Sequence, residues 1–158
     1  MIPQEFLLPY LVTNIISAAL LFAAFKWPRL TRVLFVLIFT AAGLFNIYTA
    51  ITEPQVYQTY KELAVLAIYR NFIDGFFSEH TQLIIIIIAV GQLCVGALLV
   101  GSGRLLRMGV IGGIIFLVAI APLGFGSAFP ATLLMVGALF ISQLRIIRKQ
   151  KQKRITNH

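Results

Sequence analysis

The sequence predicts an all-α integral membrane protein: a bundle of five transmembrane helices with an amphipathic interfacial helix on its outer face. Hydrophobic residues make up 59% of the 158-residue chain and charged residues only 11%, whereas about a quarter of a typical soluble domain is charged. Several apolar runs reach the roughly 20 residues that a helix needs to cross the hydrocarbon core. They lack the two-residue alternation of a membrane β-strand, so their backbone groups must be satisfied within helices.

Each expected span ends at a polar, basic or proline-containing segment. The first ends at KWPRLTR, the second at TEP and the third at SGRLLR. The last apolar region, 108–144, is too long for one crossing, and PLGFGSAFP interrupts it with prolines and glycines that are typical of a turn. The expected spans of the single membrane domain, 1–158, are therefore about 7–25, 33–50, 83–101, 108–122 and 130–144.

The basic residues predict the orientation of these spans. Eleven of the thirteen lie in three segments: between the first and second spans, between the third and fourth spans, and in the tail, 145–158. With five spans and the N-terminus outside, all three segments are cytoplasmic, as the positive-inside rule requires. Four spans would put the tail outside. In the five-span topology the cytoplasmic tail acts as a solvated anchor that can contact anionic lipids, and no nucleic-acid partner is expected.

The outer segment, 52–81, is slightly acidic and rich in aromatic residues. Glu53 and Pro54 favour a helix start, and from 55 to 67 polar side chains share one face while apolar side chains share the other. We expect a helix that lies on the outer leaflet, with Tyr60 and Leu63 facing the membrane. Two roles stay open for it: an interfacial anchor, or a lid over an opening between helices.

Side chains that carry out catalysis or bind metals are scarce. The chain has two histidines, His80 and His158, and a single cysteine, Cys94, without a CxxC motif. No Asp, Glu, Lys, Arg or His falls at the centre of a span, where proton relays and most ion pumps need such groups. Phosphate-binding and dinucleotide-binding motifs are absent from the sequence. We therefore expect no metal, no cofactor and no enzymatic activity from the chain by itself.

Neutral amides remain as candidate functional side chains inside the spans. Asn14 and Asn46 fall in the outer half of the membrane and Gln92 falls near its midplane. A carboxamide exposed to lipid is costly, so Gln92 must face protein, water or a ligand. It could form an interhelical hydrogen bond, worth ~0.6 kcal/mol on average. Alternatively, Asn14, Asn46 and Gln92 line a pocket beneath the outer helix with Tyr60, and contact the polar head of a ligand.

Glycines are placed where they would let helices approach closely. Gly91 and Gly96 flank Gln92 in the third span, and Gly109 and Gly113 form a GxxxG spacing in the fourth. Small residues at such positions allow close helix packing in membranes. We expect the third and fourth spans to be a tightly packed pair, with Gln92 held against a neighbouring helix.

Two stretches resemble the DoxX-like family of small bacterial integral membrane proteins: a span that begins at a basic residue and ends in AAGLFNIY, and the later AVGQLCVGALLVGSGRLLRMG. The resemblance covers roughly Arg32–Arg145 and implies a four-helix bundle, to which the first span is an N-terminal addition. It also implies the bacterial inner membrane and association with redox or sulfur-oxidising systems whose activity resides in partner proteins. Asn46 stands where the family often has lysine and Gln92 where it often has glutamate, so an activity that needs those charges is not expected.

Two classes of function fit these features. The first is a non-catalytic membrane subunit, a small helical bundle that binds a lipid, a quinone or a similar amphiphile and associates with another membrane or redox protein. The second is a transporter or flippase of hydrophobic small molecules. Transporters commonly contain inverted repeats, and no such repeat is visible in the sequence. Five spans also divide poorly into halves, so the first class is favoured.

Overall fold

The computed structural model describes residues 4–59, 64, 66–123 and 129–156. Within this part of the chain, each of five long helices contains a stretch long and apolar enough to cross a membrane, and no residue is in a β-strand. The predicted all-α bundle is confirmed, and every expected span overlaps one helix. The helices are α1 (Gln4–Lys26), α2 (Pro28–Thr52), α5 (Ser78–Val100), α6 (Gly103–Ile120) and α7 (Ala131–Thr156).

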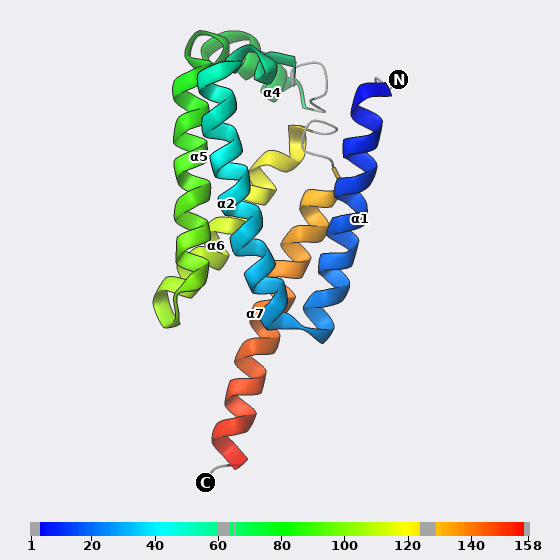
Figure 1. The fold of residues 1–158 in the computed structure, drawn as a ribbon, viewed down its shortest axis with the longest axis vertical. Coiled ribbons are helices and arrows are strands. Elements are labelled where there is room, and N and C mark those ends of the chain that lie inside the picture. The colour runs from blue at the N-terminus through cyan, green and yellow to red at the C-terminus, as the bar shows by residue number, and fades with distance from the viewer. Residues whose placement is uncertain (1–3, 60–63, 65, 124–128, 157–158) are drawn as a thin grey trace.

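Four of these helices form a closed ring, and α1 packs outside it. Around the ring, α2 contacts α5, α5 contacts α6, α6 contacts α7, and α7 returns to α2. The N-terminal helix packs mainly on α7 and less extensively on α2, and Figure 1 shows it at the edge of the bundle beside these two helices. The architecture is therefore a four-helix core with one added helix, the arrangement that the resemblance to the DoxX-like family implies.

Proline and glycine set the sharp boundaries between consecutive helices. Trp27 alone separates α1 from α2, and Pro28 occupies the first turn of α2, where its missing N–H leaves no hydrogen bond unmade. Gly103 begins α6 with φ of +56°, a left-handed conformation that glycine adopts without a steric penalty. These two connections let neighbouring helices run in opposite directions with very short loops.

Aromatic and aliphatic side chains fill the centre of the ring. Phe35, Leu99 and Leu139 are almost completely buried, and Phe39 meets Phe116 edge-on with 5.9 Å between ring centroids. The outside of the bundle carries large apolar side chains, and every long helix has at least one that is more than half exposed. An apolar exterior of this extent fits surrounding lipid rather than water.

Glycines allow three close helix contacts, not all of them the expected ones. A Cβ atom on Gly109 would lie 2.9 Å from the backbone nitrogen of Leu99 in α5, so α5 and α6 do pack closely. Gly96, however, faces Thr40 of α2, and Gly113 faces Leu139 of α7. The expectation that Gly91 lets a neighbouring helix approach closely is wrong. It is exposed, and a Cβ atom there would meet nothing within 4 Å.

The outer segment differs from the single amphipathic helix expected over 55–67. It contains a 3-10 helix, η1 (Pro54–Thr59), a short helix, α4 (Ala67–Phe72), and a π-helical turn, η2 (Ile73–Phe77), that leads into α5. Ala64 lies outside any helix, and Leu66 has an extended backbone before α4. Tyr57 packs in the bundle with Ala50 and Ile85, so tertiary contacts override the helical pattern of this segment. The expected contacts of Tyr60 and Leu63 lie outside the described residues.

Charged residues separate between the two ends of the bundle. Figure 1 places the α1–α2 turn, the α5–α6 turn and the C-terminal part of α7 at the end opposite α4. These three segments carry eleven of the thirteen basic residues, and we call this the basic end. Glu53, Asp74 and Glu79 belong to the outer segment at the other end. Five antiparallel crossings therefore bring together the basic segments that the sequence separates.

The orientation of the bundle predicts a labelling result. Gln58 of η1 and Gln152 of the C-terminal part of α7 are both exposed, and the outer segment and the end of α7 lie at opposite ends of the molecule. Cysteines introduced at these positions, in a chain whose exposed Cys94 is replaced by alanine, are expected to react with a membrane-impermeant maleimide from opposite sides of sealed vesicles. With the N-terminus outside, Gln58→Cys reacts in intact cells and Gln152→Cys only after permeabilisation. Reaction of both from one side would contradict five crossings.

Candidate functional site

Gln92 is buried and hydrogen-bonded across two helices. Its side chain is 5% exposed, and its Oε1 accepts a hydrogen bond of 2.7 Å from Nδ2 of Asn46 in α2. The two helices can approach here because Gly43 of α2 lies against Leu93 and the carbonyl oxygen of Ala89. Two amides that are 46 residues apart in sequence thus satisfy each other inside the bundle, as a buried polar group requires.

Tyr57 extends this pair into a chain of three polar side chains. Its hydroxyl donates a hydrogen bond of 2.8 Å to Oδ1 of Asn46, and the residue is 7% exposed. We call Tyr57, Asn46 and Gln92 the polar chain. Donation runs from Tyr57 to Asn46 and from Asn46 to Gln92, so both carbonyl oxygens accept. Nε2 of Gln92 has no hydrogen-bond acceptor within the described part of the chain, and this N–H group is the free donor at the end of the polar chain.

A cavity of about 400 Å³ opens beside the polar chain, and all three of its residues line it. We call it the amide cavity. The rest of its lining is apolar or aromatic and comes from the outer segment, α5, α6 and the residues just after α6. These further lining residues are Tyr69, Phe72, Ile73, Phe77, Ile84, Ile85, Ile88, Phe116, Ala119, Ile120 and Leu123. The site therefore combines one polar end with a long apolar wall.

The outer segment covers this cavity. Four of the lining residues belong to α4 and η2, and the hydroxyl of Tyr69 donates a hydrogen bond of 2.6 Å to the carbonyl oxygen of Ala119 in α6. This bond ties α4 to the opposite wall of the cavity. Of the two roles left open by the sequence, the contacts agree with a cover over an opening between helices.

A second, smaller cavity of about 170 Å³ shares part of its wall with the amide cavity. Gln92, Phe116 and Ile120 line both cavities. The smaller one is also lined by Thr132, which is 4% exposed and whose Oγ1 has no hydrogen-bond partner in the part of the chain described. A buried hydroxyl without a partner is costly, and a polar ligand atom or a water in this cavity would satisfy it.

The structure brings together only part of the expected site. Asn46 and Gln92 meet, but Asn14 lines neither cavity, and its Nδ2 donates to the carbonyl oxygen of Tyr10 in its own helix. The expectation that Asn14 shares the pocket is therefore wrong, because a helix can satisfy a short amide locally. Tyr60 lies outside the described residues. Tyr57 was missed, because the sequence shows it only as one of several aromatic residues in the outer segment.

Other reactive side chains lie apart from the cavities. Cys94 is exposed. His80 stacks on Phe76 with 4.6 Å between ring centroids. The Nδ1 atom of His80 lies 3.1 Å from the carbonyl oxygen of Phe76. Among the described residues there is no group of three or more His, Cys, Asp or Glu side chains that could hold a metal ion. The amide cavity therefore offers hydrogen bonding and apolar contact as its chemistry.

Comparison with models of protein families, with curated proteins and with solved structures found no match to this chain. The resemblance to the DoxX-like family stays a prediction that rests on the two stretches quoted from the sequence.

Proposed function

We propose that this protein is a non-catalytic membrane subunit that binds a small lipid-like or quinone-like amphiphile in the amide cavity. The observation that carries the proposal is the buried polar chain, which ends in a free N–H group of Gln92 on the wall of an otherwise apolar cavity. A volume of about 400 Å³ falls within the usual range for small-molecule sites, roughly 300–1,000 Å³.

The polar chain restricts the chemistry of the ligand head. Because Gln92 presents Nε2 as a donor, a head group with a hydrogen-bond acceptor, such as a carbonyl oxygen, is favoured. No Asp, Glu, Lys, Arg or His is among the described residues that line the cavity, so a charged head would have no counter-ion. The ligand is therefore an uncharged amphiphile, with its acceptor against Gln92 and its apolar part against isoleucine and phenylalanine side chains.

The location and partner belong to the same proposal. The clustered basic segments support an N-terminus outside and a C-terminus in the cytoplasm, and the resemblance to the DoxX-like family supports the bacterial inner membrane. The amide cavity then opens near the outer face. Association with a redox protein rests on the resemblance to the DoxX-like family, and it would explain how a chain with few reactive side chains takes part in a reaction.

The smaller cavity supports a second candidate, a transporter or flippase of hydrophobic molecules. The two cavities meet at Gln92, Phe116 and Ile120, so movement of these side chains would extend the ligand's path into the bundle. Phe35 and Phe39 line the smaller cavity within the packed core, which favours binding over passage. In sealed proteoliposomes, the binding proposal expects retention of the amphiphile without transfer between leaflets; transfer that depends on the protein would favour the transporter.

Replacing Gln92 by leucine tests the binding site. Gln92→Leu keeps a side chain of similar volume and removes the free donor. We expect the amphiphile that co-purifies with the protein, measured by mass spectrometry of an organic extract, to fall about 3- to 10-fold, which corresponds to the loss of one hydrogen bond. The free energy of unfolding should change by at most ~1–2 kcal/mol, because interhelical hydrogen bonds contribute little in membranes.

Gln82→Leu is the matched control, because Gln82 is an exposed amide on the same helix and lines neither cavity. It should retain the wild-type amount of amphiphile. If Gln92→Leu also retains the wild-type amount, the pair formed by Asn46 and Gln92 is only a structural contact and the proposed site is wrong. If the wild-type protein yields no amphiphile, the binding function itself is contradicted.

A further inference from the structure

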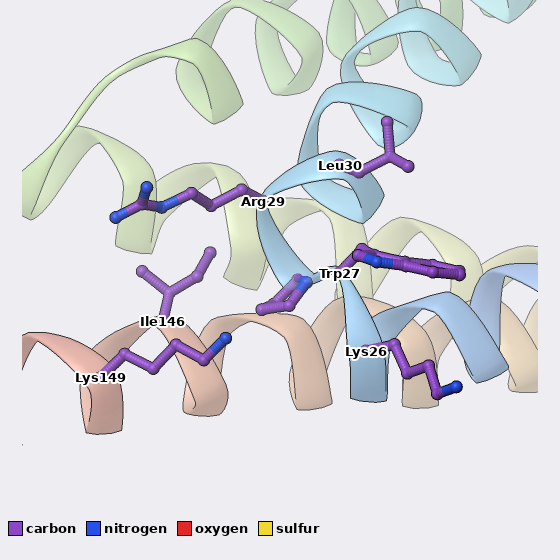
Figure 2. A pocket seen from close by; sticks show the side chains of 7 residues that line it. Lys26, Trp27, Arg29, Leu30, Ile146 and Lys149 are labelled. Atoms are coloured by element: carbon purple, nitrogen blue, oxygen red, sulfur yellow. The ribbon is translucent and has the colours of Figure 1, made fainter.

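A groove of about 550 Å³ is lined by residues around the α1–α2 turn and by α7, and these segments lie at the basic end of the bundle, opposite α4. It forms where α1 ends, α2 begins and α7 passes beneath them (Figure 2). Its positive charges come from three helices: Lys26 of α1, Arg29 of α2 and Lys149 of α7. Figure 2 shows Arg29 above Ile146 and Lys149 below it, with the guanidinium directed outward and the ammonium turned toward the middle of the groove, while Lys26 lies on the other side.

The charge of this groove is not neutralised by the described part of the protein. Arg29 and Lys149 are exposed and have no carboxylate partner within the described residues. The ammonium group of Lys26 lies 5.7 Å from the ring centroid of Phe22 and 6.0 Å from that of Trp27, and such contacts leave its charge intact. A concave site with several unpaired cations concentrates anions.

The start of α2 adds a second attraction for an anion. Trp27 precedes the helix without a side-chain hydrogen bond to its first turn, so the N–H groups of that turn lack a side-chain cap. The positive end of the helix dipole and these N–H groups favour a bound anion such as phosphate. Arg29 lies in the same turn, so its side chain starts beside the uncapped helix end.

The remaining lining of the groove is apolar. Trp27 is 55% exposed, Leu30 is half exposed, and Ile146 is buried at the base of the groove. Tryptophan is enriched where membrane proteins meet the lipid head groups. The groove therefore offers cations for a head group and an apolar surface for the part of the same molecule that continues into the membrane.

We propose that this groove binds a phosphate-bearing anion, with Arg29 and Lys149 on the phosphate oxygens and the uncapped start of α2 beside them. An anionic phospholipid supplies both this phosphate and the acyl chains that would cover Trp27 and Leu30. Free inorganic phosphate shares the head-group chemistry but not the apolar contacts. The site is independent of the amide cavity and does not rest on the function proposed for it.

The single tryptophan of the chain provides a reporter, because Trp27 lines this groove. The full-length protein is reconstituted in phosphatidylcholine vesicles that contain a fixed fraction of either brominated phosphatidylglycerol or brominated phosphatidylcholine. We expect the anionic lipid to quench Trp27 fluorescence more strongly. Arg29→Gln together with Lys149→Gln should reduce this preference about 25-fold, which is about fivefold for each cation removed.

Arg104→Gln together with Arg107→Gln is the matched control. It removes the same charge at the basic end, from side chains outside the groove, and should leave the preference within about twofold at physiological salt, where exposed charges beyond ~8 Å are screened. If the first double variant fails to fold, Lys149→Gln alone, in the exposed part of α7, should give the fivefold loss.

The results separate the two sources of phosphate and can overturn the proposal. If inorganic phosphate relieves the quenching and sodium chloride of equal ionic strength does not, phosphate itself competes for the site. If inorganic phosphate has no such effect, the lipid is the occupant. Equal quenching by the two brominated lipids, or equal losses in the two double variants, would show that the groove has no specific anion site.

Discussion

Gly109→Ala is expected to destabilise the bundle by about 1–3 kcal/mol, although it adds only one methyl group. The new Cβ atom would lie 2.9 Å from the backbone nitrogen of Leu99 and 3.0 Å from the carbonyl carbon of Leu98. Both are main-chain atoms of the α5 terminus, which cannot move aside as a side chain can. The helices must separate, and the close contact between α5 and α6 is lost. Unfolding monitored by circular dichroism in mixed micelles measures this change.

Gly91→Ala is the matched control for this experiment. A Cβ atom on Gly91 would meet nothing within 4 Å, and alanine favours a helix interior over glycine by up to about 1 kcal/mol. The free energy of unfolding should stay the same or rise. If the two variants were destabilised equally, the effect would come from loss of glycine in a helix rather than from the close contact at Gly109.

The sequence was sufficient to predict the helices because a helix that crosses lipid needs a long run of apolar residues, which can be read from the sequence directly. Each span is an uninterrupted apolar run, and prolines, glycines and basic residues mark its ends. The outer segment was harder, because its conformation depends on tertiary contacts. Tyr57 packs inward and donates to Asn46, and η1 is a 3-10 helix instead of the start of a longer α-helix. The local pattern of polar and apolar residues does not predict such tertiary contacts.

The candidate site was predicted in part, and helix geometry explains the difference. Gln92 and Gly96 are four residues apart and share one face of α5, whereas Gly91 is turned about 100° away. The observed burial follows this spacing: Gln92 and Gly96 are buried and Gly91 is exposed. Helix periodicity could not show which of Asn14 and Asn46 bonds to Gln92. An asparagine in a helix can bond to its own backbone, and only the packing of α2 on α5 shows that Asn46 bonds elsewhere.

The amide cavity and the groove at the basic end differ in the chemistry of their lining residues. The amide cavity uses neutral donors and an apolar wall, whereas the groove at the basic end uses cations. An anionic lipid would find no counter-ion among the described residues that line the first, and an uncharged amphiphile would leave Arg29 and Lys149 unpaired in the second. The two proposed sites would therefore favour ligands of different charge.

Filling the amide cavity should have the largest effect on ligand binding. Ala119 lines the cavity and is exposed, so Ala119→Trp can place an indole ring in the space without displacing the packed core. The carbonyl oxygen that accepts from Tyr69 belongs to the backbone and is retained. We expect the co-purified amphiphile to fall by at least about tenfold, equivalent to ~1.4 kcal/mol of binding free energy, because the ligand and the indole compete for the same volume.

The control for this variant is Ala97→Trp, which adds the same ring to an exposed position on α5 outside both cavities. It should retain the wild-type amount of amphiphile. The two variants should also have similar free energies of unfolding, since neither ring enters the core. This comparison separates occupancy of the cavity from a general effect of tryptophan on lipid association. If Ala119→Trp retained as much amphiphile as Ala97→Trp, the ligand would be bound on the lipid-facing surface, and the amide cavity would not be its site.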